Sequence, residues 1–368
     1  MRYFRPAQLF FAAFVASAPL AGPASAATPQ IATDITPVYG LVAQVMKGVG
    51  TPSLIIRPGS DPHHYSLRPS EAANIQNADI IFWTGAELTP WLKPALTNLA
   101  GNAETISLLK APGITILEAG EDGHHHGAAH DAHDDHNEQD NHAKHNDHDH
   151  DRDKHDDHNE KDDHAKHDDH DHDTHDDHNE QDDHAKHDDH DTHDGHEAID
   201  PHAWLDPENA RIWTRVIAQT LSHHDPAHAA IYQANADRAI EEITRQQTHI
   251  ETLLATQQLP PVFVQHAAFA YFENRFNLTL AGALYDRENE APSPAHIAQL
   301  HALTDTMPKA CLLAESTVEN NVIASVFDHT DLLVREVNPS GLAGALVENA
   351  YIELLTALAD SLEDCARH

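Results

Sequence analysis

Short runs of consecutive apolar residues alternate along the chain with longer segments in which apolar residues recur at helical spacing. Apolar runs bounded by Gly, Pro or Asp turns are typical of buried strands, and the longer segments are typical of amphipathic helices. The predicted strands cover residues 31–35, 53–56, 80–83, 114–117, 262–264, 278–284, 311–314 and 332–337. Because several of these strands are short continuous apolar runs and alternate with helices, they predict βα units on parallel sheets.

One predicted helix is much longer than the others. The helices are expected at residues 37–46, 69–77, 90–99, 207–221, 225–255, 265–274, 294–303, 319–327 and 341–362. The fifth begins at Asp225-Pro226, a favourable N-cap and first-turn pair, and would extend roughly 45 Å. It separates two groups of βα units. We therefore predict an α/β fold with an N-terminal lobe over 27–222, a rigid interlobe helix over 223–258 and a C-terminal lobe over 259–368.

Residues 1–26 have the pattern of a cleavable secretory signal. Arg2 and Arg5 precede an apolar run at 9–20, and Ala24-Ser25-Ala26 is a small-residue cleavage site. The run is too short to span a bilayer, and no later stretch is long enough to do so. We expect the mature chain to start at Ala27 and to function in the periplasm.

A tract of His and Asp interrupts the pattern of strands and helices at residues 121–198. Residues 124–196 hold 23 of the 35 histidines, with 24 Asp and 3 Glu against 6 Lys or Arg, so their formal charge is −21. They contain no Leu, Ile, Val, Phe, Met, Trp or Tyr. Without side chains to bury, the tract is expected to be a disordered loop.

The density of imidazole and carboxylate groups in this tract favours metal binding over the alternative of a solubilising spacer, which Asp, Glu, Lys and Ser would serve equally well. We expect the tract to collect metal ions weakly for another site. The histidines expected to do so include His124, His125, His126, His130, His133, His136, His142, His145, His148, His150, His155 and His158.

The charge of the rest of the chain limits the classes of partner. The formal net charge of the whole chain is −38, so −17 remains outside the tract. Nucleic-acid binding needs a clustered positive surface, which makes a nucleic-acid partner improbable. An acidic protein is suited to handling cations.

Cys311 and Cys365 are the two cysteines of the chain. In an oxidising compartment a disulfide between them is expected. A thiolate metal site is the competing interpretation, and the absence of a C-x-x-C motif makes it weaker.

Three histidines outside the tract share one kind of position. His63, His202 and His266 each lie in a loop or strand end where an open α/β sheet presents binding groups, and they come from both lobes. Three imidazoles converging between lobes would form a zinc site with one open position. The remaining histidines are expected to be ordinary capping or surface residues, namely His64, His223, His224, His228, His249, His296, His301, His329 and His368.

The stretches G-S-D-P-H-H-Y, D-P-H-A-W-L-D-P and V-Q-H-A-A-F-A-Y-F-E-N, in this order, resemble the solute-binding proteins of ABC importers for zinc and manganese, and in particular the zinc branch, the ZnuA family. The resemblance covers essentially the whole mature chain. It implies a monomeric, non-enzymatic periplasmic protein that passes Zn²⁺ to an inner-membrane ABC permease and its ATPase. It also implies metal ligation by His63, His202 and His266 and a disulfide between Cys311 and Cys365.

The chain departs from the family pattern at one position. Members often carry an acidic ligand after the last strand, whereas this chain has Asn338 in V-N-P-S-G. A neutral amide binds zinc poorly, so we expect water or a tract histidine as the fourth ligand.

Three other functions are consistent with parts of the sequence. A zinc hydrolase would use the same three-histidine centre, but the chain has no H-E-x-x-H or G-x-S-x-G motif. A zinc store would depend on the tract alone. A manganese or iron carrier would be expected to have Glu in place of His266.

Overall fold

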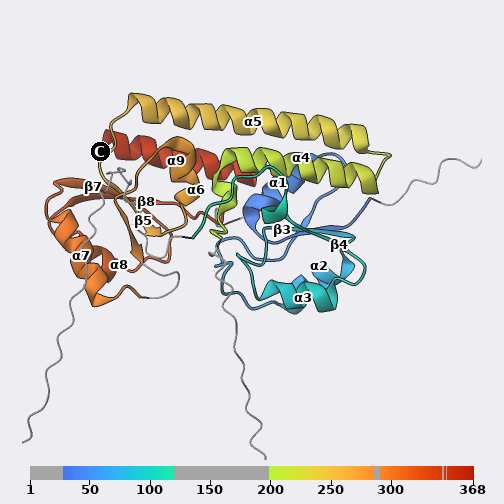
Figure 1. Cartoon of the computed structure of the whole chain (residues 1–368), viewed down its shortest axis with the longest axis horizontal. Helices are drawn as coiled ribbons and strands as arrows, with labels where there is room; N and C mark the ends of the chain where they lie inside the picture. Colours follow the sequence, from blue (N-terminus) through green and yellow to red (C-terminus); the bar gives the residue numbers. More distant parts are fainter. Residues whose placement is uncertain (1–27, 120–198, 286–290, 342–343, 345) are drawn as a thin grey trace, which may run out of the picture. The chain divides into compact units, whose positions relative to one another are not determined.

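The computed structural model of the chain describes residues 28–119, 199–285, 291–341, 344 and 346–368. Its strands form two four-stranded sheets with the orders β2-β1-β3-β4 and β6-β5-β7-β8, and every pairing is parallel. The strands are β1 (Ile31–Thr33), β2 (Ser53–Leu54), β3 (Ile80–Trp83), β4 (Glu104–Ser107), β5 (Val262–His266), β6 (Gly282–Tyr285), β7 (Lys309–Ala314) and β8 (Asp331–Glu336). The predicted α/β class with two parallel sheets is confirmed (Figure 1).

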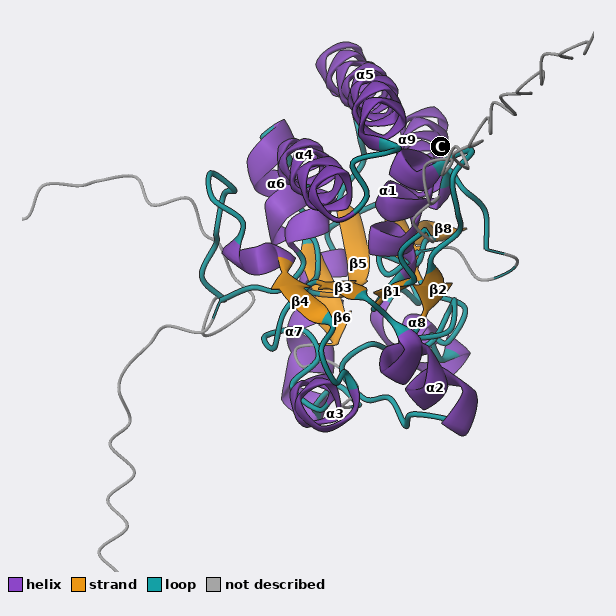
Figure 2. Ribbon diagram, turned by 90° about the vertical axis from the view of Figure 1, so that its right-hand side faces the viewer, coloured by secondary structure: helices purple, strands orange, loops and turns teal. Residues whose placement is uncertain are grey.

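Helices cover both faces of the strand layer (Figure 2). The helices are α1 (Thr36–Met46), α2 (Pro69–Asn77), α3 (Leu92–Leu99), α4 (Pro207–His224), α5 (Ala229–Thr256), α6 (Ala270–Phe276), α7 (Pro294–Thr304), α8 (Asn320–Val326) and α9 (Ala350–Arg367), with short 3-10 turns η1 (Leu108–Lys110) and η2 (Ala203–Leu205). In Figure 2, α1, α4, α5 and α9 lie on one side of the strands, and α2, α3, α7 and α8 lie on the other. Each sheet is therefore covered by helices on both faces, which explains why a central strand such as β3 is apolar and buried along its whole length.

Strand β7 shows how the sheet separates two apolar cores. Cys311 and Leu313 point into the large core, whereas Leu312 and Ala314 point into a smaller one that also contains Phe327. This division follows from the alternation of side chains along a strand. The large core continues from the first sheet through α1, α5 and α9 to β5 and β7, so it contains residues of both lobes.

Helix α9 returns from the second sheet and packs against both α1 and α5. The helices α1 and α9 approach closely at Gly40, where a Cβ atom would lie 2.5 Å from the backbone nitrogen of Tyr351. Glycine is the residue that permits this approach, because any side chain would meet backbone that cannot rotate away. Close helix packing across one apolar core disfavours large movements between the lobes.

One predicted element near the end of the first lobe is wrong. The predicted strand at 114–117 is absent, and β4 lies ten residues earlier in a segment that is not continuously apolar. Backbone amides of this segment hydrogen-bond to side chains instead of to a neighbouring strand. The Thr115 amide donates to Asn209 Oδ1 at 2.7 Å, and the Leu117 amide donates to the Tyr271 hydroxyl at 3.0 Å. An apolar run alone does not show whether its backbone will hydrogen-bond to a neighbouring strand or to side chains.

Helix boundaries also differ from the predicted ones. The segment 265–274 is not helical from its start, because Gln265 and His266 belong to β5 and α6 begins at Ala270. The closing helix begins at Ala350 and not at residue 341. The long helix is α5, which begins at Ala229 because Asp225 and the residues after it form a turn that follows α4.

The predicted disulfide is present. Cys311 on β7 and Cys365 on α9 are bonded, with Cα atoms 5.7 Å apart, so the covalent link ties the last helix to the second sheet. Both cysteines are fully buried. Among the described helices, none has the length and apolar character that crossing a bilayer requires. The predicted signal at 1–26 and the His/Asp tract lie outside the described residues.

Candidate metal centre

His63 lies in the loop that connects β2 to α2. Its backbone amide donates to Asp61 Oδ1 at 2.8 Å, a side-chain turn that sets the direction of the loop. The Trp91 indole donates to the carbonyl of Pro62 at 2.8 Å, so the loop is also tied to the residue before α3. These two contacts hold the His63 backbone in place although the residue belongs to no regular element.

His202 occupies the most enclosed position of the three. Only 6% of it is exposed, and it lies directly before η2. Asp200 Oδ1 lies 2.8 Å from the ring atom Nδ1 and also 2.8 Å from the backbone amide of His202. A carboxylate that accepts from Nδ1–H fixes the ring tautomer and leaves Nε2 as the ligand atom.

His266 is the last residue of β5. Its Nδ1 lies 3.1 Å from Glu315 Oε1, and Glu315 directly follows β7, the neighbouring strand. The Glu315 amide donates to the Gln265 side chain at 2.8 Å, which holds the two strand ends together. The pairing of His266 with Glu315 repeats the imidazole–carboxylate arrangement of His202 with Asp200.

The structure brings these three imidazole rings together. The ring centres of His63 and His202 are 5.4 Å apart, and those of His202 and His266 are 5.9 Å apart. Zinc bonded at about 2.0–2.1 Å to imidazole nitrogens in tetrahedral directions would place the ring centres about 5.2 Å apart. The spacing of His202 from each of the other two rings is therefore within about 1 Å of the separation that a shared zinc ion requires.

Contacts from the C-terminal part of the chain hold the segment that carries His202. The Tyr271 hydroxyl donates to the carbonyl of Asp200 at 2.9 Å. The Tyr351 hydroxyl donates to the carbonyl of Trp204 at 2.8 Å, and the Trp204 indole donates to the carbonyl of Pro339 at 2.8 Å. Burial raises the pKa of Tyr271 to about 12, so this hydroxyl remains a donor at neutral pH.

A partly buried ion pair, with the Arg275 side chain 27% exposed, lies immediately after the same segment. The Arg275 guanidinium contacts both carboxylate oxygens of Asp206, at 2.6 and 2.7 Å, and Asp206 is fully buried. Asp206 Oδ1 also accepts the amide of Glu208 and so caps α4. The hydrogen bond to Asp206 raises the pKa of Arg275. The pair fixes α6 against the start of α4, two elements that flank the imidazole cluster.

A cavity of about 280 Å³ adjoins His266 and is lined from both lobes. Among the described residues, its lining includes the carboxylates of Asp61, Glu315 and Glu319 and no Lys or Arg. Side chains of one sign around a concave surface raise the local concentration of the opposite ion. The cavity therefore favours the approach of a cation to the imidazole rings.

Asn338, the position where the family often carries an acidic ligand, takes part in a backbone turn. Its Oδ1 accepts the amide of Ser340 at 2.8 Å in the turn that follows β8. The predicted metal-collecting histidines of the tract lie outside the described residues.

Two carboxylates were missed by the sequence interpretation, Asp200 and Glu315. Asp200 stands in the same D-P-H motif as His202, and Glu315 directly follows a strand, so position alone could have marked both. Nothing in the sequence, however, indicates which histidine each carboxylate contacts.

Comparison with known proteins places the chain in a family. The family model described as "Zinc-uptake complex component A periplasmic", ZnuA, matches residues 31–365. The high-affinity zinc uptake system protein ZnuA of Paracoccus denitrificans is 37% identical over 365 residues, covering 98% of each chain. The ZnuA protein of Brucella abortus is 35% identical over 335 residues, covering 91% of each chain.

Solved structures show the same fold at lower identity. The periplasmic zinc-binding protein TroA from Treponema pallidum superimposes on this chain with a TM-score of 0.65. It is 14% identical, the match covers 92% of this chain and 99% of that one, and the likeness therefore supports the fold alone. The match over nearly all of the described residues, together with three converging imidazoles, establishes that the chain belongs to the ZnuA family of periplasmic zinc-uptake solute-binding proteins.

Proposed function

We propose that this chain captures Zn²⁺ in the periplasm with His63, His202 and His266 and delivers it to an ABC permease driven by its ATPase in the inner membrane. The observation that carries the proposal is the spacing of the three rings, 5.4 and 5.9 Å, at strand ends and loops of two different sheets. Three neutral imidazoles suit zinc better than manganese, which prefers more oxygen ligands. The fourth position is assigned to water or to a histidine of the tract, because the neutral amide of Asn338 is a poor zinc ligand.

Release to the permease is expected to need small movements. The segment around His202 hydrogen-bonds to Tyr271, Tyr351 and the carbonyl of Pro339. A wide hinge would break these bonds and the Arg275–Asp206 ion pair together. Local movement of the His63 loop would leave these hydrogen bonds and the ion pair intact, so we assign the release of zinc to movement of this loop.

Asp200 offers a test of how the ring of His202 is held. Replacement of Asp200 with alanine removes the acceptor at Nδ1, and zinc affinity should fall about 10- to 100-fold. The measurement is a competition titration against a zinc chelator. Asp200→Asn is the matched control, because its amide oxygen can still accept a hydrogen bond from Nδ1–H of His202. Its zinc affinity should fall less than that of Asp200→Ala. Equal affinity of Asp200→Ala and the unmodified protein would show that this carboxylate does not orient the ligand.

Zinc uptake in cells tests the proposed function and separates it from a zinc store. A strain lacking the gene is complemented with the unmodified protein, with the triple variant His63→Ala, His202→Ala, His266→Ala, or with a variant lacking residues 124–196. We expect the triple variant to lose uptake almost completely. The variant without the tract should take up zinc normally when zinc is ample and more slowly when zinc is scarce, because the tract is assigned the role of a weak collector.

The opposite pattern would contradict the proposal. Normal uptake by the triple variant, with loss of uptake in the variant without the tract, would indicate that the tract alone carries the function. Equal uptake by the tract variant under scarce zinc would remove the collector role and leave the three-histidine centre unaffected.

A further inference from the structure

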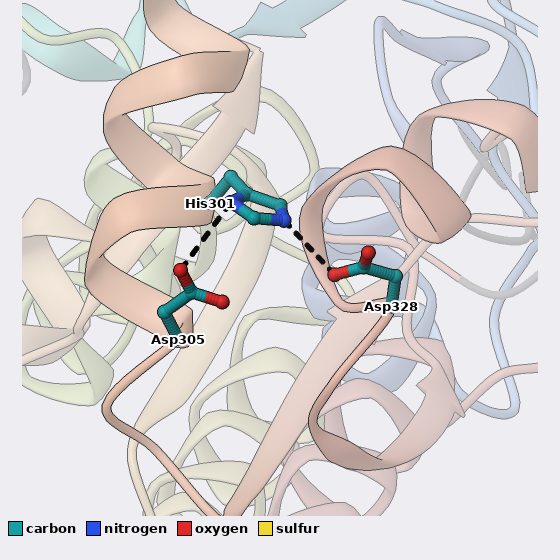
Figure 3. Close-up of side chains that lie close together, drawn as sticks. All are labelled: His301, Asp305 and Asp328. Atoms are coloured by element: carbon teal, nitrogen blue, oxygen red, sulfur yellow. Dashed lines mark hydrogen bonds and ion pairs between the residues drawn. The ribbon is translucent and has the colours of Figure 1, made fainter.

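A second group of metal-ligating side chains lies in the C-terminal lobe, apart from the three-histidine centre. His301 on the last turn of α7, Asp305 just after that helix and Asp328 just after α8 each offer a ligand atom within 4.8 Å of the others (Figure 3). His301 Nε2 lies 2.9 Å from Asp328 Oδ1, and His301 Nδ1 lies 3.8 Å from Asp305 Oδ2. The three side chains point toward one another from two helix ends that are far apart in the sequence.

A fourth potential ligand adjoins this group. His329 Nε2 lies 3.3 Å from Asp328 Oδ2, and the ring centres of His301 and His329 are 6.2 Å apart. Two imidazoles on one tetrahedral zinc ion would lie about 5.2 Å apart. The His329 side chain is 70% exposed and is not held by packing, so a rotation can close this difference.

The backbone beneath the group is fixed. The Thr304 hydroxyl donates to the carbonyl of Val326, and the Thr330 hydroxyl donates to the carbonyl of Thr304 at 3.1 Å. These bonds join the carboxyl ends of α7 and α8, and Thr304 is only 2% exposed. The carboxyl end of a helix carries partial negative charge, so two such ends favour a bound cation.

The group and the three-histidine centre lie at opposite ends of the strands of the second sheet. Asp305 precedes β7 and Asp328 precedes β8, so the group lies at the amino ends of these strands. His266 and Glu315 lie at the carboxyl ends of β5 and β7. The six residues of β7 separate the two ends by about 17 Å, which is too far for one ion to be shared.

We propose that His301, Asp305, Asp328 and His329 form a second binding site for a divalent cation of the zinc class. Mixed imidazole and carboxylate ligands select zinc over Mg²⁺, which takes oxygen ligands. The site is weaker than the three-histidine centre, because its side chains are more exposed and no carboxylate outside the group, within the part of the chain that the structure describes, contacts His301. It fills when free zinc is high enough to have saturated the buried rings.

The test measures the reactivity of individual histidines in the full mature chain. Diethyl pyrocarbonate modifies accessible imidazoles, and peptide mass spectrometry reads the rate at His301 separately from the tract and from His202. A chelator buffer sets the free zinc concentration, so zinc bound by the tract does not alter it. At free zinc about ten times the dissociation constant, modification of His301 should slow about tenfold, because only the ion-free protein reacts.

Matched variants assign the protection to this group. Asp328→Asn should abolish zinc protection of His301 and leave zinc binding at the three-histidine centre unchanged, which also shows that the variant is folded. Asp305→Asn is the second variant and should weaken the protection. Asp360→Asn, an exposed carboxylate on α9 outside the group, should retain it fully.

Two results would overturn the proposal. One is a rate at His301 that zinc does not change even at free zinc concentrations far above those that saturate the three-histidine centre. The other is full protection of His301 in both Asp328→Asn and Asp305→Asn. Protection by Mg²⁺ equal to that by Zn²⁺ would contradict the assigned cation class.

Discussion

Replacement of His63 with alanine should lower the zinc affinity of the three-histidine centre about a thousandfold. A zinc site of this kind binds with a free energy of about 12 kcal/mol, and one of three protein ligands accounts for roughly a third of it, or about 4 kcal/mol. His202 and His266 would remain, but two imidazoles do not hold zinc against a strong chelator. The measurement is a competition titration with a chelator at free zinc too low for the tract to bind.

His64 is the matched control, because it is the adjacent residue and has the same side chain. Its ring is 74% exposed and lies 3.5 Å from Asp61. His64→Ala should therefore leave the affinity within about twofold of the unmodified protein, as is usual for exposed surface substitutions. Equal losses in the two variants would show that the loop as a whole, and not the His63 ring, supports binding.

Replacement of Arg275 with methionine should destabilise the fold by about 3–5 kcal/mol. Methionine keeps much of the aliphatic volume but leaves the Asp206 carboxylate fully buried without its cationic partner. The free energy of unfolding is measured by urea denaturation of zinc-free protein. Zinc affinity should also fall, because Asp206 caps α4 directly after the segment that carries His202.

A double variant separates the buried charge from other effects of the substitution. Asp206→Asn keeps an oxygen that accepts the Glu208 amide but removes the charge. Combined with Arg275→Met, it should recover most of the lost stability. A single Arg275→Met variant that loses less than about 1 kcal/mol would show that the pair behaves as an exposed ion pair.

The sequence predicts this architecture well where a local pattern determines the element. Strand β3 and helix α2 have the predicted bounds, because each is a continuous run with clear turn signals at both ends. The predicted strand at 114–117 fails, because its backbone partners are the side chains of Asn209 and Tyr271. Those partners are distant in sequence and leave no periodic signal.

The three histidines could be selected from the sequence, because parallel sheets place their strand ends together. The contacts that hold these three side chains could not be predicted from the sequence. Asp200 and Glu315 orient rings, and Tyr271 and Arg275 hold the His202 segment from α6. Each of these contacts depends on packing between separate elements.

His301 and His329 show the same limit more clearly. Each reads in the sequence as an ordinary surface histidine, because neither has a recognisable motif around it. The two approach Asp328 only because α7 and α8 end side by side. A ligand set made from two helix ends becomes visible only in the fold.

Diffraction from zinc-loaded crystals of the mature chain, recorded on both sides of the zinc absorption edge, tests the central claim most directly. The account predicts a strong anomalous peak about 2.0–2.1 Å from one nitrogen each of His63, His202 and His266. A chain that carries zinc with no peak at these three rings would contradict it.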